Sequence, residues 1–177
     1  MKIIEAMKQI KDLQIKAKDL RDKVATYCAD QSHETAVYGD KQRDKIKEWI
    51  QAHGDIVRRI MELRVAIQKA NITIGVTIEL GGKPVTKSIA EWIHRRRDLA
   101  ELERTLWAGV GDRNLREGLI KTSTGETQTV TIRRYYDPSE RDKSIELYRS
   151  EPTTIDSTLE TINAVTDVEV GGSNSGK

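Results

Sequence analysis

Residues 46–74, IKEWIQAHGDIVRRIMELRVAIQKANITI, place apolar side chains at alternating spacings of three and four residues. This spacing lines up one apolar strip along a helix and is typical of a heptad pattern, here held over about four repeats. A strip of this length needs an equally long partner to cover it. The positions of the strip are Ile46, Trp49, His53, Ile56, Ile60, Leu63, Ile67, Ala70 and Ile74.

The partner is supplied by residues 3–27, which repeat the same apolar spacing. Residues 29–41 lose this period and collect Asp, Ser, Thr and Gly, so we expect a loop there, with Tyr38 folding back onto the helices. Two amphipathic helices joined by a short loop predict an antiparallel helical hairpin, roughly 40 Å long. The polar residue of the second strip, His53, is expected to fix the helix register or the subunit number.

The pattern changes at residues 71–86, NITIGVTIELGGKPVT, where β-branched residues alternate on either side of two glycines. We interpret this segment as a short β-hairpin or an extended excursion. Thr86 or Ser88 can cap a third helix, and Glu91, three residues after Ser88, completes a capping-box pattern. This helix is predicted to end near Gly109. The apolar run of this helix is Ile89, Trp92, Ile93, Arg96, Leu99, Leu102 and Leu106.

Two further segments precede the last helix. Residues 111–128 are rich in Gly, Thr and charge, and we expect a loop there. Residues 129–136, TVTIRRYY, alternate between apolar and polar side chains as a strand does. This strand could pair with the earlier hairpin, so that the β structure forms a small insertion in a helical chain.

A last helix is predicted to start at Pro138, because proline is favoured in the first turn of a helix. Pro152 lies on its apolar strip and is expected either to kink this helix or to split it in two near Ser150. Together the elements predict a mainly α fold, a long antiparallel helical hairpin plus further helices in a bundle, with a small β-hairpin or strand insertion. We expect a single helical domain over residues 1–170 and a flexible tail over residues 171–177.

The composition suits thin helix-on-helix packing, because 33% of the 177 residues are charged, only 5% are aromatic and Phe is absent. The formal net charge is +2 at pH 7. This small charge excludes the bulk electrostatic attraction of a dedicated duplex-DNA binder and leaves room for local basic patches. Nucleic acid is therefore not a favoured partner.

Cys28 is the only cysteine, so neither an intrachain disulfide nor a thiolate zinc cluster can form. This suits a reducing compartment, and we expect a cytoplasmic protein. The opening MKIIEAMKQI carries charges where a signal peptide is apolar, and no apolar run approaches the roughly twenty residues of a membrane span, so neither secretion nor a membrane partner is expected. The three histidines show no metal-ligand spacing, so no metal and no cofactor are predicted.

The motifs of known catalytic centres are missing from the sequence, including GxSxG and HExxH. The segment 171–177 matches the skeleton of a phosphate-binding G-x-x-x-x-G-K loop, but it lacks the following Ser or Thr and the strand-to-helix context. The carboxylates are spread along helix surfaces, and no pair stands out as an acid–base couple. We therefore expect a protein that is not an enzyme; the enzymatic alternative is a nucleotide hydrolase with His94 as base.

The densest unusual cluster lies in the third helix and consists of Trp92, His94, Arg95, Arg96 and Arg97. Three consecutive arginines on a helix point in directions about 100° apart, so at least one faces the core or a subunit interface. Two interpretations stay open. In the first, the arginines form ion pairs with acidic neighbours on a solvated face. In the second, they line an anion pocket, because guanidinium groups bind phosphate or carboxylate and a tryptophan can stack a base.

A second cluster, Arg133, Arg134, Tyr135 and Tyr136, ends the predicted strand. In a strand, Arg133 and Tyr135 share one face, and Arg134 and Tyr136 share the other. An arginine beside an aromatic ring suits nucleobase and phosphate binding, and it equally suits a protein interface. If the strand meets the third helix, within the chain or across a subunit boundary, the two clusters form one basic, aromatic-lined cavity.

Four segments carry a resemblance to a known family: MKIIEAMKQIKDLQ (1–14), ELRVAIQKANITI (62–74), KSIAEWIHRRRDLAELERTL (87–106) and TIRRYYDPSERDKSIEL (131–147). In these segments and in the order of its parts, the chain resembles the septicolysin-like proteins, small helical proteins of bacteria and their phages. The resemblance covers nearly the whole chain and implies oligomers built from long helical hairpins. The arginine-rich third helix and Pro152 depart from the family pattern.

These observations favour a non-catalytic homo-oligomer that binds and sequesters a small phosphate-bearing, nucleotide-like ligand in a basic aromatic pocket. Since the resembling family includes phage proteins, a counter-defence protein that sequesters a nucleotide immune signal is a concrete form of this hypothesis. The alternatives are a structural assembly oligomer with no small ligand and a single-stranded nucleic-acid binder. We also expect Ile50 and Val57, which are apolar residues outside the strip, to pack on further helices of this chain or of a neighbouring subunit.

Overall fold

The computed structural model describes residues 1–171 and divides into two compact units. Unit 1 comprises Met1–Ile74 and residues 159–171, and unit 2 comprises Gly75–Thr158. The chain is mainly α with two small antiparallel hairpins, which confirms the predicted fold class. The single domain predicted for residues 1–170 stays a prediction, and the predicted tail lies, apart from Gly171, outside the described residues.

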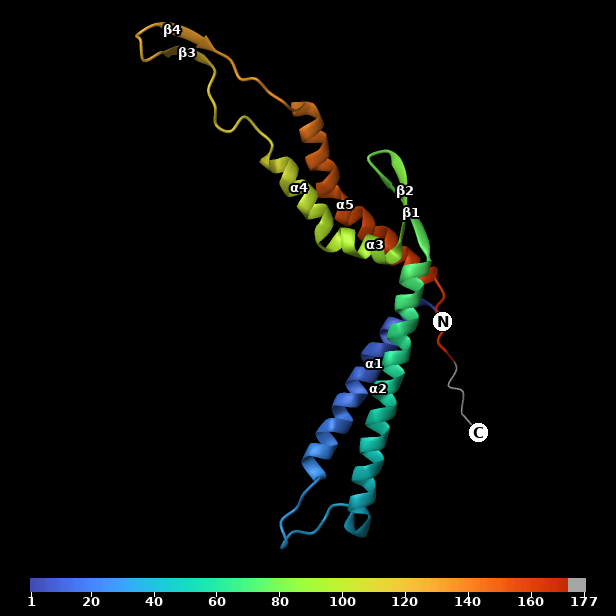
Figure 1. The fold of residues 1–177 in the computed structure, drawn as a ribbon. Helices are drawn as coiled ribbons and strands as arrows, with labels where there is room; N and C mark the ends of the chain where they lie inside the picture. The colour runs from blue at the N-terminus through green and yellow to red at the C-terminus, as the bar shows by residue number, and fades with distance from the viewer. Residues whose placement is uncertain (172–177) are drawn as a thin grey trace. The chain divides into compact units, whose positions relative to one another are not determined.

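Unit 1 is built on an antiparallel helical hairpin of α1 (Ile3–Tyr27) and α2 (Gln42–Thr73), with a short 3₁₀ turn, η1 (Gly39–Lys41), before α2 (Figure 1). The predicted hairpin is thereby confirmed. Tyr38 folds back from the loop as predicted, and its ring lies edge-on to the rings of Tyr27 and Trp49, with centroids 5.7 and 5.5 Å away. These three rings close the loop end of the hairpin.

The hairpin is covered unevenly along its length. Its buried residues gather at the end where α1 begins and α2 finishes, whereas the strip residues toward the loop, His53 among them, are only half-buried. Ile50 and Val57 are exposed, so no described helix covers them. The buried residues of α1 and α2 are Ile3, Ala6, Leu63, Ala66 and Ala70.

The beginning of α1 is tied to residues that follow the last helix. The backbone N–H of Ile3 donates to the carbonyl of Thr166 over 2.9 Å, and the N–H of Val168 donates to the carbonyl of Met1 over 2.7 Å. The Lys2 ammonium donates to the carboxylate of Asp167, also over 2.7 Å. Unit 1 is therefore closed by contacts between segments at opposite ends of the described chain.

Unit 2 begins with the antiparallel hairpin of β1 (Gly75–Leu80) and β2 (Lys83–Ser88), in which Ile78 lies opposite Val85. The turn residues Gly81 and Gly82 have φ of +57° and +74°, a conformation that glycine adopts at little cost. The predicted β-hairpin is confirmed. Val76 and Ile78 of β1 are buried, so one face of the hairpin belongs to the core of the unit.

A continuous helical run follows, made of α3 (Ile89–His94), η2 (Arg95–Leu99) and α4 (Ala100–Gly109). Ser88 caps it as predicted: its hydroxyl accepts from the backbone N–H of Glu91, and the Glu91 carboxylate accepts from the N–H of Ser88. The run also ends where the sequence predicts.

This run changes register at η2, which is a π-helical turn. A π turn holds more residues than an α turn, so the residues after it are rotated by about one position. Ala100 is buried and Trp107 half-buried, whereas Leu102 is 64% exposed. The apolar run predicted from a regular α-helix is therefore wrong in this half of the helix. Its exposed members are Leu99, Leu102 and Leu106.

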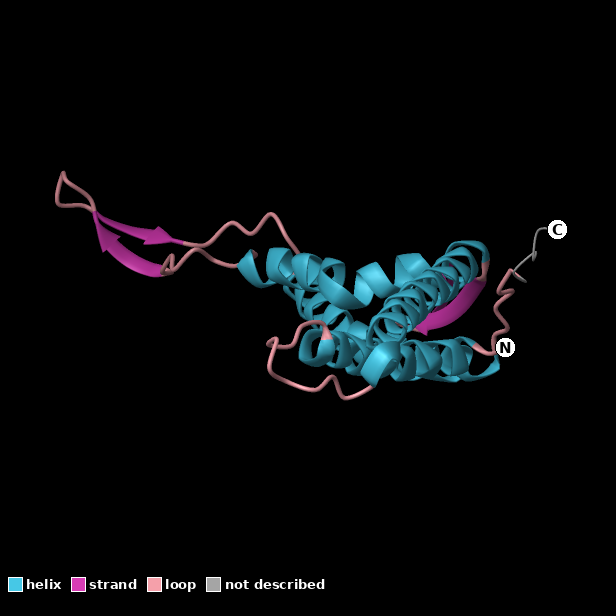
Figure 2. Ribbon diagram, turned by 90° about the horizontal axis from the view of Figure 1, so that it is seen from below, coloured by secondary structure: helices cyan, strands magenta, loops and turns pink. Residues whose placement is uncertain are grey.

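A second antiparallel hairpin, β3 (Gly118–Lys121) with β4 (Thr127–Val130), stands away from the helices of unit 2 (Figure 2). Two predictions are wrong here. Residues 111–128 are not one loop, since they contain β3 and the start of β4. The strand predicted for 129–136 ends at Val130 and pairs with β3, not with the earlier hairpin, because the tight turn at Gly125 (φ +84°) brings the nearer segment alongside.

The last helix, α5 (Pro138–Val165), starts at the predicted proline and runs through Pro152 without interruption. The alternative that Pro152 splits the helix is therefore wrong. Ile155 and Leu159 are buried, as the apolar strip predicts. Over residues 1–171, no helix is both long enough and apolar enough to cross a membrane.

Candidate functional site

The candidate residues of the third helix lie in different environments. Trp92 is fully buried, and its indole N–H donates to the carbonyl of Val76 in β1 over 2.9 Å. His94 is exposed, and its Nδ1 lies 3.2 Å from a guanidinium nitrogen of Arg97. Trp92 thus serves as the anchor between α3 and the first β-hairpin, with its ring covered by the protein itself.

The three arginines of the π turn, Arg95, Arg96 and Arg97, point in different directions, and each contacts a polar partner. Arg95 binds Glu151, and Arg96 approaches Asp156 with an Nη1–Oδ1 distance of 2.5 Å. Arg97 turns back along its own helix, toward His94 and Asp98. The ion-pair interpretation of the cluster therefore describes its geometry within the chain.

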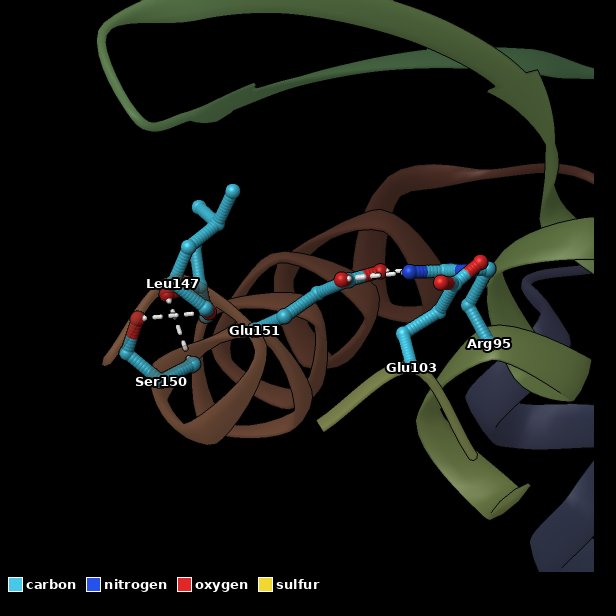
Figure 3. A network of polar contacts seen from close by, with 6 residues as sticks. Arg95, Glu103, Leu147, Ser150 and Glu151 are labelled. Carbon is cyan, nitrogen blue, oxygen red and sulfur yellow. Dashed lines mark hydrogen bonds and ion pairs between the residues drawn. The ribbon is translucent and has the colours of Figure 1, made fainter. Parts of the chain in front are cut away.

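The pair of Arg95 and Glu151 is the most buried of these contacts (Figure 3). The two groups meet at two points, Nε to Oε1 and Nη2 to Oε2, each 2.7 Å long. The side chain of Glu151 is 1% exposed and that of Arg95 is 20% exposed. Glu103 adds a second carboxylate 3.9 Å from Arg95, and the ring of Tyr148 lies 5.7 Å from the guanidinium carbon.

The electrostatics of this pair follow from its geometry. Hydrogen bonding to Glu151 raises the pKa of the Arg95 guanidinium, although burial acts in the opposite direction. Burial also raises the pKa of the Tyr148 hydroxyl. A bidentate arginine–carboxylate pair with so little exposure has no free donor fork for a ligand. The arrangement fixes α3 and η2 to α5.

The second cluster is centred on Asp112, which follows α4. The guanidinium of Arg134 donates to both oxygens of Asp112, over 2.8 and 2.6 Å, and the Tyr136 hydroxyl donates to the same carboxylate over 2.7 Å. Hydrogen bonds from Arg134 and then from Tyr136 lower the pKa of Asp112 from 3.8 to about 2, and the bond to Asp112 raises the pKa of Arg134. This contact joins the two ends of the segment 113–133, which carries β3 and β4. We call this junction the neck.

The other two residues of this cluster stay open to solvent. Arg133 is exposed and Tyr135 is 87% exposed. Arg133 has no ion-pair partner among residues 1–171. Because both lie beyond the end of β4, the strand faces predicted for them do not exist. Arg134 and Tyr136 nevertheless reach one carboxylate from the same side, as an alternating segment allows.

The two clusters are not joined by any contact within the described chain. One hollow of unit 2, about 430 Å³, lies beside Gly81 and the first turns of α5, and its lining, which includes Asp137, Glu140 and Leu147, contains no residue of either cluster. No group of three or more His, Cys, Asp or Glu side chains suited to a metal ion occurs in residues 1–171. The described residues thus hold paired charges and not an assembled pocket.

Sequence reasoning missed the two carboxylates that organise these clusters, Glu151 and Asp112. Glu151 had a signal: together with Tyr148, Ile155 and Leu159 it continues a three-four spacing, which marks it as a strip residue in place of Pro152. Asp112 had none, because it lies in an irregular segment, 22 positions before its arginine partner.

No family model, no curated protein and no solved structure matches this chain. The resemblance to the septicolysin-like proteins therefore stays a prediction from the sequence.

Proposed function

We propose that this chain is a non-catalytic assembly protein that associates with copies of itself through its helical hairpin, and that its arginines serve as internal ion-pair clamps. The observation that carries the proposal is the two-point pairing of Arg95 with the buried carboxylate of Glu151. The arginine that faces the interior is thereby neutralised within the chain. Arg134 is likewise occupied by Asp112.

The half-covered hairpin supports the same proposal. A helix must bury its apolar strip against another element, and two helices alone cover only one side of each other. Along α2, large apolar residues stay exposed from Ile50 to Ile72. A partner helix would remove this surface from water, which is the dominant favourable contribution to most protein association.

The test combines mass and ligand binding on the full chain. Light scattering over a range of concentrations should give a mass above the 20.1 kDa of one chain. A thermal-shift screen with cyclic and linear nucleotides should give no shift. A monomer at every concentration would refute the assembly proposal. A tight nucleotide would raise stability by about 3 kcal/mol at a hundredfold excess over its dissociation constant, and this result would favour the second candidate.

The second candidate is a homo-oligomer that binds and sequesters a small phosphate-bearing, nucleotide-like ligand, in the form of a phage counter-defence protein against a nucleotide immune signal. It is favoured by the exposure of Arg133 and Tyr135, which leaves a cation and a ring free for a phosphate and a base. In this case Arg133→Ala should abolish the thermal shift that a nucleotide produces. Arg97→Ala, in the first cluster, is the matched control for the loss of one exposed arginine.

A further inference from the structure

The exposed apolar residues of α2 form a strip that is symmetric in sequence about Met61. Val57 and Val65 lie four residues to either side of Met61, and Ile50 and Ile72 lie eleven residues to either side. All five side chains are between 42% and 69% exposed. At about 100° per residue they fall on one side of the helix, within a sector of about 80°. The chain therefore presents a palindromic apolar strip roughly 33 Å long.

We infer that this strip is a self-complementary dimer interface, in which α2 packs antiparallel against α2 of a second copy with the twofold axis at Met61. The inference rests on the proposed assembly function and names its surface. A twofold axis brings identical patches together, so a strip that reads the same in both directions pairs each residue type with itself. Met61 meets Met61, Val57 meets Val65, and Ile50 meets Ile72 of the other copy.

The remaining positions of the strip fit the same pairing. Gly54 and Gln68 lie seven residues to either side of Met61 and complete the three-four spacing. A side chain added at Gly54 would meet nothing within 4 Å, so there is open space above this glycine. In the antiparallel pair the long side chain of Gln68 lies over Gly54 of the other copy. A large residue thus faces a space, as close packing requires.

The charges along one border of the strip are complementary under the same symmetry. Arg58 and Glu62 lie on this border, about one turn apart, and both are on the surface. In an antiparallel pair, a border faces the same border of its partner. Arg58 of each copy therefore comes within reach of Glu62 of the other, so two opposite-charge contacts form. A parallel pair would place this border against the opposite border of the partner, so Arg58 and Glu62 would not face each other and these two contacts would be lost.

Hollows beside the strip give the facing side chains room. One of about 300 Å³ lies next to Ile50 and is lined by Leu20, Val24 and His53. Another of about 290 Å³ lies next to Met61 and Val65. Ile72 of the second copy approaches the first hollow, so α1 also contributes to the interface. The half-buried His53 thereby acquires a neighbour from another chain, which agrees with a role in register.

Cysteine cross-linking tests the register directly, in a Cys28→Ser background that removes the only native thiol. Met61→Cys alone should form a covalent dimer of twice 20.1 kDa on mild oxidation or with a short bismaleimide. Ile50→Cys alone and Ile72→Cys alone should not, because equal residues then lie roughly 33 Å apart across the axis. A mixture of the Ile50→Cys and Ile72→Cys proteins should cross-link. Self-linking of Ile50→Cys as efficient as that of Met61→Cys, or no link at all, would overturn the inference.

Met61→Glu provides the second measurement. Two carboxylates at the axis should raise the dimer dissociation constant about a hundredfold, since burying unpaired like charges is costly. Gln14→Glu, at an exposed position of α1, is the matched control and should leave the mass unchanged. Circular dichroism checks that both variants keep their helices. If Met61→Glu leaves the mass of the oligomer unchanged, this interface is refuted and the assembly proposal stands. If the wild-type protein is a monomer, both are refuted.

Discussion

Arg95 and Glu151 face each other through two nitrogen–oxygen contacts of 2.7 Å each, which join the π turn to α5. Removing one partner leaves a charged group in a place that water hardly reaches. Such a loss is far more costly than the net gain from forming the pair, because the orphaned charge stays desolvated.

The first prediction follows from this difference between the cost of removing one partner and the net gain from forming the pair. Glu151→Gln should destabilise the fold by about 3 kcal/mol in urea unfolding, since Arg95 loses its counter-charge. The double variant Arg95→Met, Glu151→Met should lose less than the two single changes added together. Equal stability of Glu151→Gln and the wild type would show that the pair contributes nothing.

The second prediction concerns the stability of the Asp112 contact at acidic pH. Because contacts with Arg134 and Tyr136 lower the pKa of Asp112 to about 2 in the folded chain, its charged form stabilises the neck at pH above the ordinary value of 3.8. This contribution is lost as the pH falls through 3.8 toward about 2. The protection factors of the β3 and β4 amides, which compare their hydrogen exchange with the intrinsic rate at each pH, should therefore fall over this range.

Asp112→Asn separates this effect from general acid unfolding. The variant should show fast exchange in β3 and β4 already at neutral pH, together with faster tryptic cleavage at Arg113 and Arg133. Glu126→Gln, at the turn of the same hairpin, removes one carboxylate outside the neck and should behave like the wild type. Unchanged exchange in Asp112→Asn would argue against a closing role for the contact.

The third prediction tests the anchor role of Trp92. Trp92→Phe removes the indole donor and leaves the Val76 carbonyl without its partner inside the core, at a cost of about 2 kcal/mol. Trp92→Ala adds a cavity and should cost about 4 kcal/mol. Trp107→Phe, at a half-buried site, should cost less than Trp92→Phe in the same denaturant titration.

The fourth prediction tests the register after the π turn. Leu102→Glu should change stability by no more than about 0.5 kcal/mol, because the side chain already lies in solvent. Ala100→Leu should cost about 2 kcal/mol, since a larger side chain does not fit the fully buried site. A regular α-helix through Arg95–Leu99 predicts the reverse order, so the comparison decides between them.

The sequence predicts well the features that rest on a regular spacing or on a short local motif. The spacing of three and four along α1 and α2, the Ser88–Glu91 box and the paired glycines of the first β-hairpin each specify local geometry, and the structure contains all of them. Periodicity fails where the backbone itself changes period. At η2 one extra residue turns the predicted apolar run outward, and no residue type in that segment reveals it.

The site was harder to predict for a different reason. Arg95 and Arg134 were found because arginine clusters stand out in a sequence, but their carboxylates lie 56 and 22 residues away. Helix charge patterns pair neighbours three or four residues apart, so contacts of this range come only from the tertiary fold. Glu151 was detectable as a strip residue, although its partner was not.

The bond between Lys2 and Asp167 has a consequence for biosynthesis. These residues are separated by 165 positions, so α1 leaves the ribosome long before the segment that ties down its first turn has been made. Until then the α1–α2 hairpin depends on its own contacts, because domains fold from the N-terminal side as they emerge. Of the two units, unit 1 thus begins to fold first and is completed last.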